Sequence, residues 1–125
     1  MKLPEKLKYT KEHEWVRVDG KHVIVGVTDY AQGELGDVVY VEVETLDEDL
    51  DKDEVFGTVE AVKTVSDLHM PVSGTVAEFN EELEDEPENV NSDPYGKGWM
   101  IKIIYSKPEE LDELMSAKEY EEHIK

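Results

Sequence analysis

The sequence predicts a mainly β domain that ends in a helical tail. Short runs that alternate apolar and polar residues recur about every ten residues, a spacing typical of antiparallel β structure. Glycine, proline, asparagine and aspartate separate these runs. Only after residue 105 does the apolar spacing become helical. The 125 residues therefore fit a single domain, 1–125, with a β core over about 7–105 and a C-terminal helical segment over 106–125.

The first part of the chain contains three expected strands followed by a short helix. Asp19-Gly20 joins two alternating runs, and Asp-Gly in that position is a strong hairpin signal. Thr28 suits the N-cap of a helix, and Gly36 suits its C-terminal end. We therefore expect strands at 7–10, 15–18 and 21–27 and helical turns over 28–36.

Two segments before residue 54 have contrasting patterns. Residues 37–44 alternate, which predicts a strand with one apolar and one mixed face. The apolar face contains Val39, Val41 and Val43, and the opposite face contains Tyr40 and Glu42. Residues 45–53 are acidic and hold little apolar material, so we expect a loop there.

Lys63 lies between the strand-like runs 55–61 and 67–70, at the expected tip of a hairpin. A turn between strands is exposed backbone, so a lysine there is held in water on a rigid base. For an isolated lysine the usual interpretation is an ordinary solvated charge, since lysine is rarely buried. Pro71 ends the second run, and another strand is expected at 73–79.

The last part of the chain contains one strand and then a change of period. We expect a short helical turn at 87–91, a turn at 93–96 and the strongest strand at 99–105. Ser106 with Glu109, and Ser116 with Glu119, have the spacing of a capping box. These patterns predict two short helices, or one bent helix, packed outside the sheets.

The composition is strongly acidic, with 32 Asp and Glu against 13 Lys and Arg and a net charge of −19. This charge repels nucleic acid and anionic membrane surfaces, and it favours protein partners with basic faces. No segment approaches the ~18 consecutive apolar residues of a membrane span. The first residues lack the pattern of a secretory or organellar leader, so we expect a cytoplasmic protein. Because the chain has no cysteine, any sulfur or redox chemistry must come from an attached group.

Other kinds of site find little support in the sequence. The four histidines lack the spacing of zinc ligands. Asp49, Asp51 and Asp53 alternate like calcium ligands, but the glycine that gives a calcium loop its sharp turn is missing. There is no glycine-rich phosphate loop and no nucleophile elbow. We therefore expect neither a metal site nor a catalytic residue.

The segment around Lys63, from Val59 to Asp67, and the following Pro71-Val72-Ser73-Gly74 resemble the lipoyl-lysine site of the glycine cleavage system H-protein family. Further similar blocks follow the family's order along almost the whole chain. They are 7–9 with 13–16, 26–32, 35–42, 91–96 and 98–103. The resemblance implies a barrel-sandwich hybrid of the hammerhead, or lipoyl-domain, type with two antiparallel sheets. It also implies a lipoate attached covalently to Lys63.

The resemblance further implies a carrier cycle in which the chain itself catalyses nothing. Oxidised lipoyl accepts an aminomethyl group from glycine on a pyridoxal-phosphate glycine decarboxylase. A tetrahydrofolate-dependent aminomethyltransferase takes that group and releases ammonia, and a dihydrolipoyl dehydrogenase reoxidises the dithiol. A free lysine has a pKa of ~10.4, so a lipoate ligase or a lipoyl or octanoyl transferase must supply an activated acyl group. We expect a monomer with small, transient interfaces, since one tip must visit several enzymes in turn.

Three carboxylates accompany Lys63 in the resemblance. Glu60 and Asp67 flank the lysine and are candidates for recognition by the lipoylating enzyme, although ordinary exposed acids have the same pattern. Glu14 follows His13 in the opening motif. It is a candidate for a cleft that holds the aminomethyl amine, because a partly desolvated ammonium gains from a carboxylate.

Three alternatives remain at the level of sequence. A biotinyl carrier domain typically has methionine on both sides of its lysine, whereas Val62 and Thr64 flank Lys63. A related H-like protein relays lipoate or takes part in sulfur transfer without serving glycine cleavage. A non-covalent acidic interaction module would leave Lys63 unmodified. Intact mass separates the lipoyl, biotinyl and unmodified forms.

Overall fold

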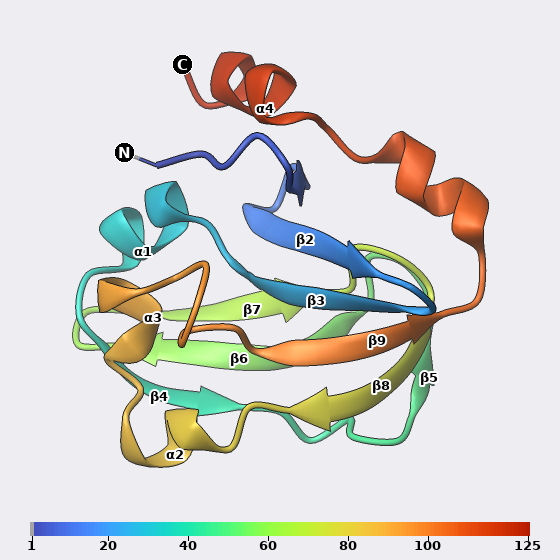
Figure 1. Ribbon diagram of the computed structural model, residues 1–125. Coiled ribbons are helices and arrows are strands. Elements are labelled where there is room, and N and C mark those ends of the chain that lie inside the picture. Colours follow the sequence, from blue (N-terminus) through green and yellow to red (C-terminus); the bar gives the residue numbers. More distant parts are fainter. Residues whose placement is uncertain (1) are drawn as a thin grey trace.

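The computed structural model describes residues 2–125, which form two antiparallel sheets with short helices around them (Figure 1). The larger sheet has the order β1 (Lys8–Tyr9), β2 (Glu14–Asp19), β3 (His22–Val27), β9 (Ile101–Tyr105), β8 (Gly74–Phe79), β5 (Asp49–Leu50). The smaller sheet has the order β4 (Val38–Glu42), β6 (Val55–Ala61), β7 (Val65–His69). The helices are α1 (Asp29–Leu35), α2 (Glu82–Asp85), α3 (Asn89–Ser92), the 3-10 helix η1 (Pro108–Glu113) and α4 (Ala117–His123). The predicted mainly β fold is confirmed.

The main core lies between the two sheets. Successive side chains of a strand point to opposite faces, so each strand gives about every second residue to this core. Burying one large apolar side chain contributes about 1.5–3 kcal/mol relative to leaving it exposed. The larger sheet supplies Val16, Val25, Val76, Ile101 and Ile103, and the smaller sheet supplies Val41, Phe56, Val59 and Leu68, each at most 2% exposed.

Two local predictions in the first part of the chain are confirmed. β2 and β3 pair up to Asp19 and His22, and Gly20 takes the positive φ of +63° that the tight turn requires. Thr28 caps α1, with its Oγ1 accepting a hydrogen bond from the Ala31 backbone N–H at 3.1 Å. Gly36 ends the helix with a φ of +80°.

The predicted faces of β4 are partly wrong. Val39 was expected in the apolar face but is 46% exposed, as is Tyr40. The pairing of β4 with β6 is irregular between Val38 and Tyr40. A bulge places two consecutive residues opposite one partner and interrupts the alternation, so Val38 and Val41 are the buried residues.

Two acidic segments contain more structure than the sequence predicts. The expected loop 45–53 includes β5, whose residues Asp49 and Leu50 pair with Thr75 and Gly74 of β8. The segment before 87 contains the short helix α2, held by the fully buried Leu83. In each segment one leucine, Leu50 or Leu83, contacts the main core. The acidic composition of the segment gives no indication of that contact.

The tail forms two separate helices, one of the two arrangements expected. The capping box predicted at Ser106 is absent, because η1 begins after Lys107, which makes no side-chain capping bond. The box predicted at Ser116 and Glu119 is present and starts α4. Over residues 2–125, no helix combines the length and the apolar character that crossing a bilayer requires.

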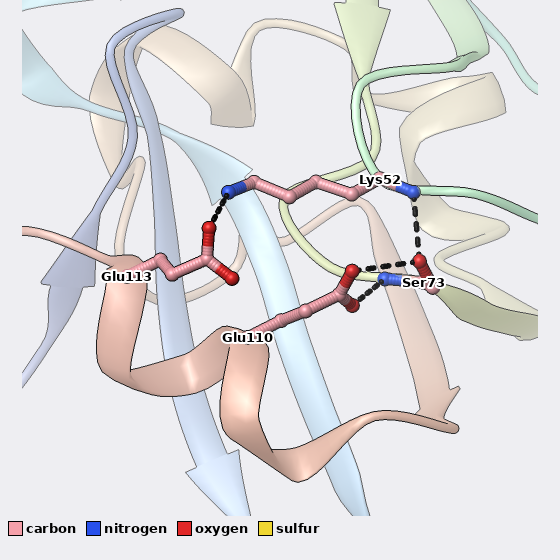
Figure 2. Close-up of polar contacts among 4 residues, drawn as sticks. All are labelled: Lys52, Ser73, Glu110 and Glu113. Carbon is pink, nitrogen blue, oxygen red and sulfur yellow. Dashed lines mark hydrogen bonds and ion pairs between the residues drawn. The ribbon is translucent and has the colours of Figure 1, made fainter.

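A polar cluster attaches η1 to the connection between β7 and β8, as Figure 2 shows. The backbone N–H and hydroxyl of Ser73 donate to the Glu110 carboxylate at 2.7 and 3.0 Å. The Lys52 backbone N–H donates to Ser73 Oγ at 2.9 Å, and Lys52 Nζ pairs with Glu113 at 3.2 Å. The surface ion pair contributes little, so the contacts of Ser73 are the main attachment.

A second apolar cluster lies under α4. The C-terminal helix packs near the N-terminal segment (Figure 1), and Tyr9 and Met115 exchange two backbone hydrogen bonds of 2.8 Å. The members of this cluster are Leu7, Tyr9, Trp15, Ala117 and Tyr120. The two chain ends therefore form one packed layer.

Candidate functional site

Lys63 lies at the tip of the β6–β7 hairpin, as the sequence predicts. The last strand pair is Glu60 with Val65, and the Ala61 N–H donates to the Thr64 carbonyl at 2.7 Å to close the turn. The Val62 N–H donates to the Asp37 carbonyl at 3.0 Å and ties the tip to the connection between α1 and β4 (Figure 1). Both backbone bonds hold the base of the lysine rigidly.

The side chain of Lys63 is accessible to solvent. Within residues 2–125, no carboxylate lies within ion-pair distance of its Nζ. The stem of the side chain lies along Gly36: a Cβ built on that glycine would be 3.1 Å from Lys63 Cε and 3.6 Å from Nζ. The C-terminal end of α1 therefore forms a surface under the lysine.

We expect Gly36→Ala to destabilise the protein by roughly 1–3 kcal/mol, because its φ of +80° with ψ of −159° is a region open essentially to glycine alone. The long lysine side chain can move aside, so backbone strain supplies most of this cost. Gly33→Ala is the matched control: Gly33 lies within α1 with nothing within 4 Å, and alanine there should be neutral or stabilising. Urea unfolding measures both variants. Equal stabilities would contradict the backbone argument.

A cavity of about 300 Å³ adjoins this surface. One wall is the segment 12–14, another is α1, and a third is formed by Val59 of β6 and residues 66–68 of β7. Leu35, one residue before the glycine under Lys63, lines the cavity, so the last turn of α1 connects the cavity wall with the surface under the lysine. We call this cavity the arm cleft. A second cavity of about 390 Å³ shares Glu12 and Glu14 with it but is otherwise lined by residues far from the hairpin tip.

Glu14 is the buried carboxyl group of the arm cleft, at 2% exposed. Its Oε1 accepts from Thr10 Oγ1 at 2.7 Å, and its Oε2 accepts from the His69 N–H at 3.3 Å. Burial raises the pKa of Glu14 to about 8, although the hydrogen bonds from Thr10 and His69 oppose the rise. The group is therefore largely neutral at pH 7.

The structure brings some predicted site residues together and separates others. Asp67 and Glu14 line the arm cleft, whereas Glu60 lies exposed beside the tip and outside the cleft. Glu12 and Glu34, which sequence reasoning did not select, also line it. Glu34 lies one helical turn after Tyr30 on α1, and this spacing of four residues was the available signal.

His13 was another missed residue of the arm cleft. It has a φ of +71°, which is unusual for a residue with a side chain. Burial lowers the pKa of His13, and the nearby His123 lowers it further. Its Nδ1 lies 2.8 Å from the hydroxyl of Tyr120 on α4, a contact across 107 residues that no local pattern reveals.

Comparisons with known proteins give one consistent result. The family described as Glycine cleavage H-protein matches residues 7–125. The glycine cleavage system H proteins of Staphylococcus carnosus, Staphylococcus saprophyticus and Staphylococcus haemolyticus are each 56% identical over 124 residues, covering 99% of this chain and 98% of theirs. The crystal structure of a glycine cleavage system H protein from Mycobacterium marinum superposes with a TM-score of 0.85 at 35% identity, covering 97% of this chain and 98% of that one.

Proposed function

Because this chain belongs to the glycine cleavage H-protein family, we propose that Lys63 is the lysine that carries its lipoyl group. The family consists of non-catalytic carriers with lipoate attached covalently to a lysine, and the chain is a lipoyl carrier of the glycine cleavage system. The observation that supports Lys63 is its exposed amine, which has no ion-pair partner among residues 2–125, on a rigid hairpin tip beside the arm cleft.

The residues around Lys63 fit such a group. The exposed amine allows an amide to form without any rearrangement of the tip, and the arm cleft offers apolar walls from Val27, Leu35 and Leu68. When attached, lipoyl supplies a disulfide that accepts the aminomethyl group. The chain supplies the rigid base, the cleft and the carboxyl groups.

The loaded arm is the lipoyl-lysine side chain with the aminomethyl group attached. Glu14 is the proposed partner for the amine of this arm. A carboxylate binds an ammonium group strongly where water is largely excluded. Burial favours the neutral acid, so Glu14 keeps its proton below about pH 8 while no cation is bound. Binding of a cation lowers the pKa of Glu14, so the group then releases its proton at a lower pH. Asp67 and Glu34 would add negative charge at the exposed side of the same cleft.

The individual partners are part of this proposal. They are a pyridoxal-phosphate glycine decarboxylase, a tetrahydrofolate-dependent aminomethyltransferase, a dihydrolipoyl dehydrogenase, and a lipoate ligase or lipoyl or octanoyl transferase. The net charge of −19 favours basic docking faces on all of them. Glu60, beside the tip and outside the arm cleft, is available to the lipoylating enzyme. A monomeric state and a cytoplasmic location remain predictions, which sedimentation and cell fractionation test.

Reconstitution tests the function. The chain is incubated with lipoate, ATP and a lipoate ligase, and peptide mapping locates the adduct, which we expect on Lys63 alone. The lipoylated chain is then added to the decarboxylase with labelled glycine, and release of labelled carbon dioxide should depend on it. An adduct on another lysine would contradict the site. Transfer of lipoate to other carriers without glycine decarboxylation would instead support the lipoate relay.

A further inference from the structure

Tyr120 joins the C-terminal helix to the arm cleft. Its side chain is fully buried, and its ring stacks on Tyr9 with centroids 4.9 Å apart and planes 10° from parallel. The capping box of Ser116 and Glu119 begins α4 one turn earlier, and Tyr120 donates its N–H to the Ser116 carbonyl at 2.9 Å. Helix and ring stacking together fix where the Tyr120 hydroxyl lies.

That hydroxyl lies between two walls of the arm cleft. It is 2.8 Å from His13 Nδ1 and 2.8 Å from Thr28 Oγ1. His13 lines the cleft directly, and Thr28 is the N-cap of α1, which lines another wall. The Thr28 N–H also donates to the His13 carbonyl at 3.0 Å, so the two walls meet at this point.

The proton positions follow from the partners. Thr28 Oγ1 already accepts from the Ala31 N–H, so its own proton is available to Tyr120. Burial lowers the pKa of His13, which favours a neutral ring whose Nδ1 can accept. Burial also raises the pKa of Tyr120 to about 12, so its hydroxyl keeps a proton to donate. In the tautomer with Nδ1 unprotonated, Tyr120 donates to His13 and Thr28 donates to Tyr120.

His13 needs such support because of its backbone. Its φ of +71° lies in the left-handed region, which persists for a bulky residue only when the surroundings hold it. Glu14 follows immediately, so the strained backbone of His13 leads directly into the residue with the buried carboxyl. On the side of α4, the Tyr120 hydroxyl makes the hydrogen bond to the ring, and the His123 ring lies with its centroid 6.0 Å from that of His13.

We propose that Tyr120 is a positioning residue whose hydroxyl fixes the His13 wall of the arm cleft against α1, so that the C-terminal helix sets the shape of the cleft. This inference rests on the proposed function, because it concerns the cleft in which the loaded arm is protected. It adds a residue from the far end of the chain that is not among the residues lining the cleft but contacts His13, which is.

The variant Tyr120→Phe removes the hydroxyl and keeps the ring that stacks on Tyr9. We expect unchanged lipoylation of Lys63. Water adds its oxygen to the aminomethyl carbon, and breaking of the C–S and C–N bonds gives formaldehyde, ammonia and a thiol. Without partner enzymes this loss should become roughly three- to tenfold faster, as the loss of one or two hydrogen bonds allows. Tyr105→Phe is the matched control, since Tyr105 donates to the Gly20 carbonyl at 2.6 Å far from the cleft. Its loss rate should equal that of the wild type.

A second measurement, an NMR titration, does not require the lipoyl group. In the unmodified chain, the NMR titration of His13 should shift to higher pH in Tyr120→Phe, because the bond to Nδ1 that favours the neutral ring is gone. His123, Glu12 and Glu34, which also face His13, are unchanged in this variant. A purely structural role of Tyr120 would lower stability and leave this titration where it is.

His13→Gly provides a test that is independent of Tyr120 folding defects. Glycine accepts the positive φ, so the backbone is kept and only the ring is lost. The loss rate should rise about as much as in Tyr120→Phe, and the double variant should add little more. Additive effects, or a wild-type loss rate in Tyr120→Phe, would overturn the inference. Absence of lipoylation at Lys63 would instead overturn the proposed function.

Discussion

A Lys63→Arg variant is expected to accept no lipoyl group while folding like the wild type. Acylation needs a neutral amine, and the guanidinium of arginine stays protonated under all ordinary conditions. Lys63 is exposed and unpaired among the described residues, so the substitution should change stability by at most about 0.5 kcal/mol. We expect lipoylation to fall below detection.

Intact mass after incubation with lipoate, ATP and a lipoate ligase measures the effect. Lys102→Arg is the control, because Lys102 pairs with Glu78 at 3.7 Å on the larger sheet, and this variant should be lipoylated like the wild type. Thermal unfolding monitors the fold of both. A lipoylated Lys63→Arg chain, or an unfolded one, would contradict the assignment.

The second large effect concerns Glu14 and pH. Its pKa rises from an ordinary 4.5 to about 8 in the folded chain, so between these values the folded state binds a proton that the unfolded state has lost. The stability that this group supports is therefore complete below about pH 4.5 and is lost as the pH rises to about 8. A difference of this size corresponds to about 4–5 kcal/mol.

Glu14→Gln removes this titration. Relative to the wild type, the variant should gain roughly 4 kcal/mol of unfolding free energy between pH 4 and pH 9. The other acidic groups are shared by both chains, so their pH dependence cancels in the difference. Urea unfolding across this pH range measures it, with Glu60→Gln as a control at an exposed position. If the difference in unfolding free energy between Glu14→Gln and the wild type does not change with pH, the carboxyl is ionised at neutral pH in the folded protein.

Local signals predict the parts of this fold that local interactions decide. The turn at Gly20, the cap at Thr28 and the capping box at Ser116 depend on backbone angles and on bonds within a few residues. The position of Lys63 at a hairpin tip follows in the same way, from two strand-like runs with a short connection.

Long-range contacts and single-residue irregularities are not predicted by such local sequence signals. The bulge in β4 exposes Val39 because one extra residue reverses the alternation, and no turn residue marks it. The burial of Glu14 depends on Thr10 and His69, and the support of His13 depends on Tyr120. These partners come together only when both sheets and the C-terminal helix have packed, so sequence order contains no direct sign of them.

Two backbone hydrogen bonds close the turn at Lys63 and attach it to the connection between α1 and β4. They also limit the positions that a long side chain on Lys63 can reach. With the Ala61 and Val62 N–H groups both engaged, the loop is a fixed pivot, and all excursion comes from rotation about single bonds beyond the Cα atom. The end of the side chain can then reach only part of a sphere centred on the Lys63 Cα atom. An enzyme that acts on a group carried by this lysine must therefore bring its own active site within the length of the extended side chain from that point.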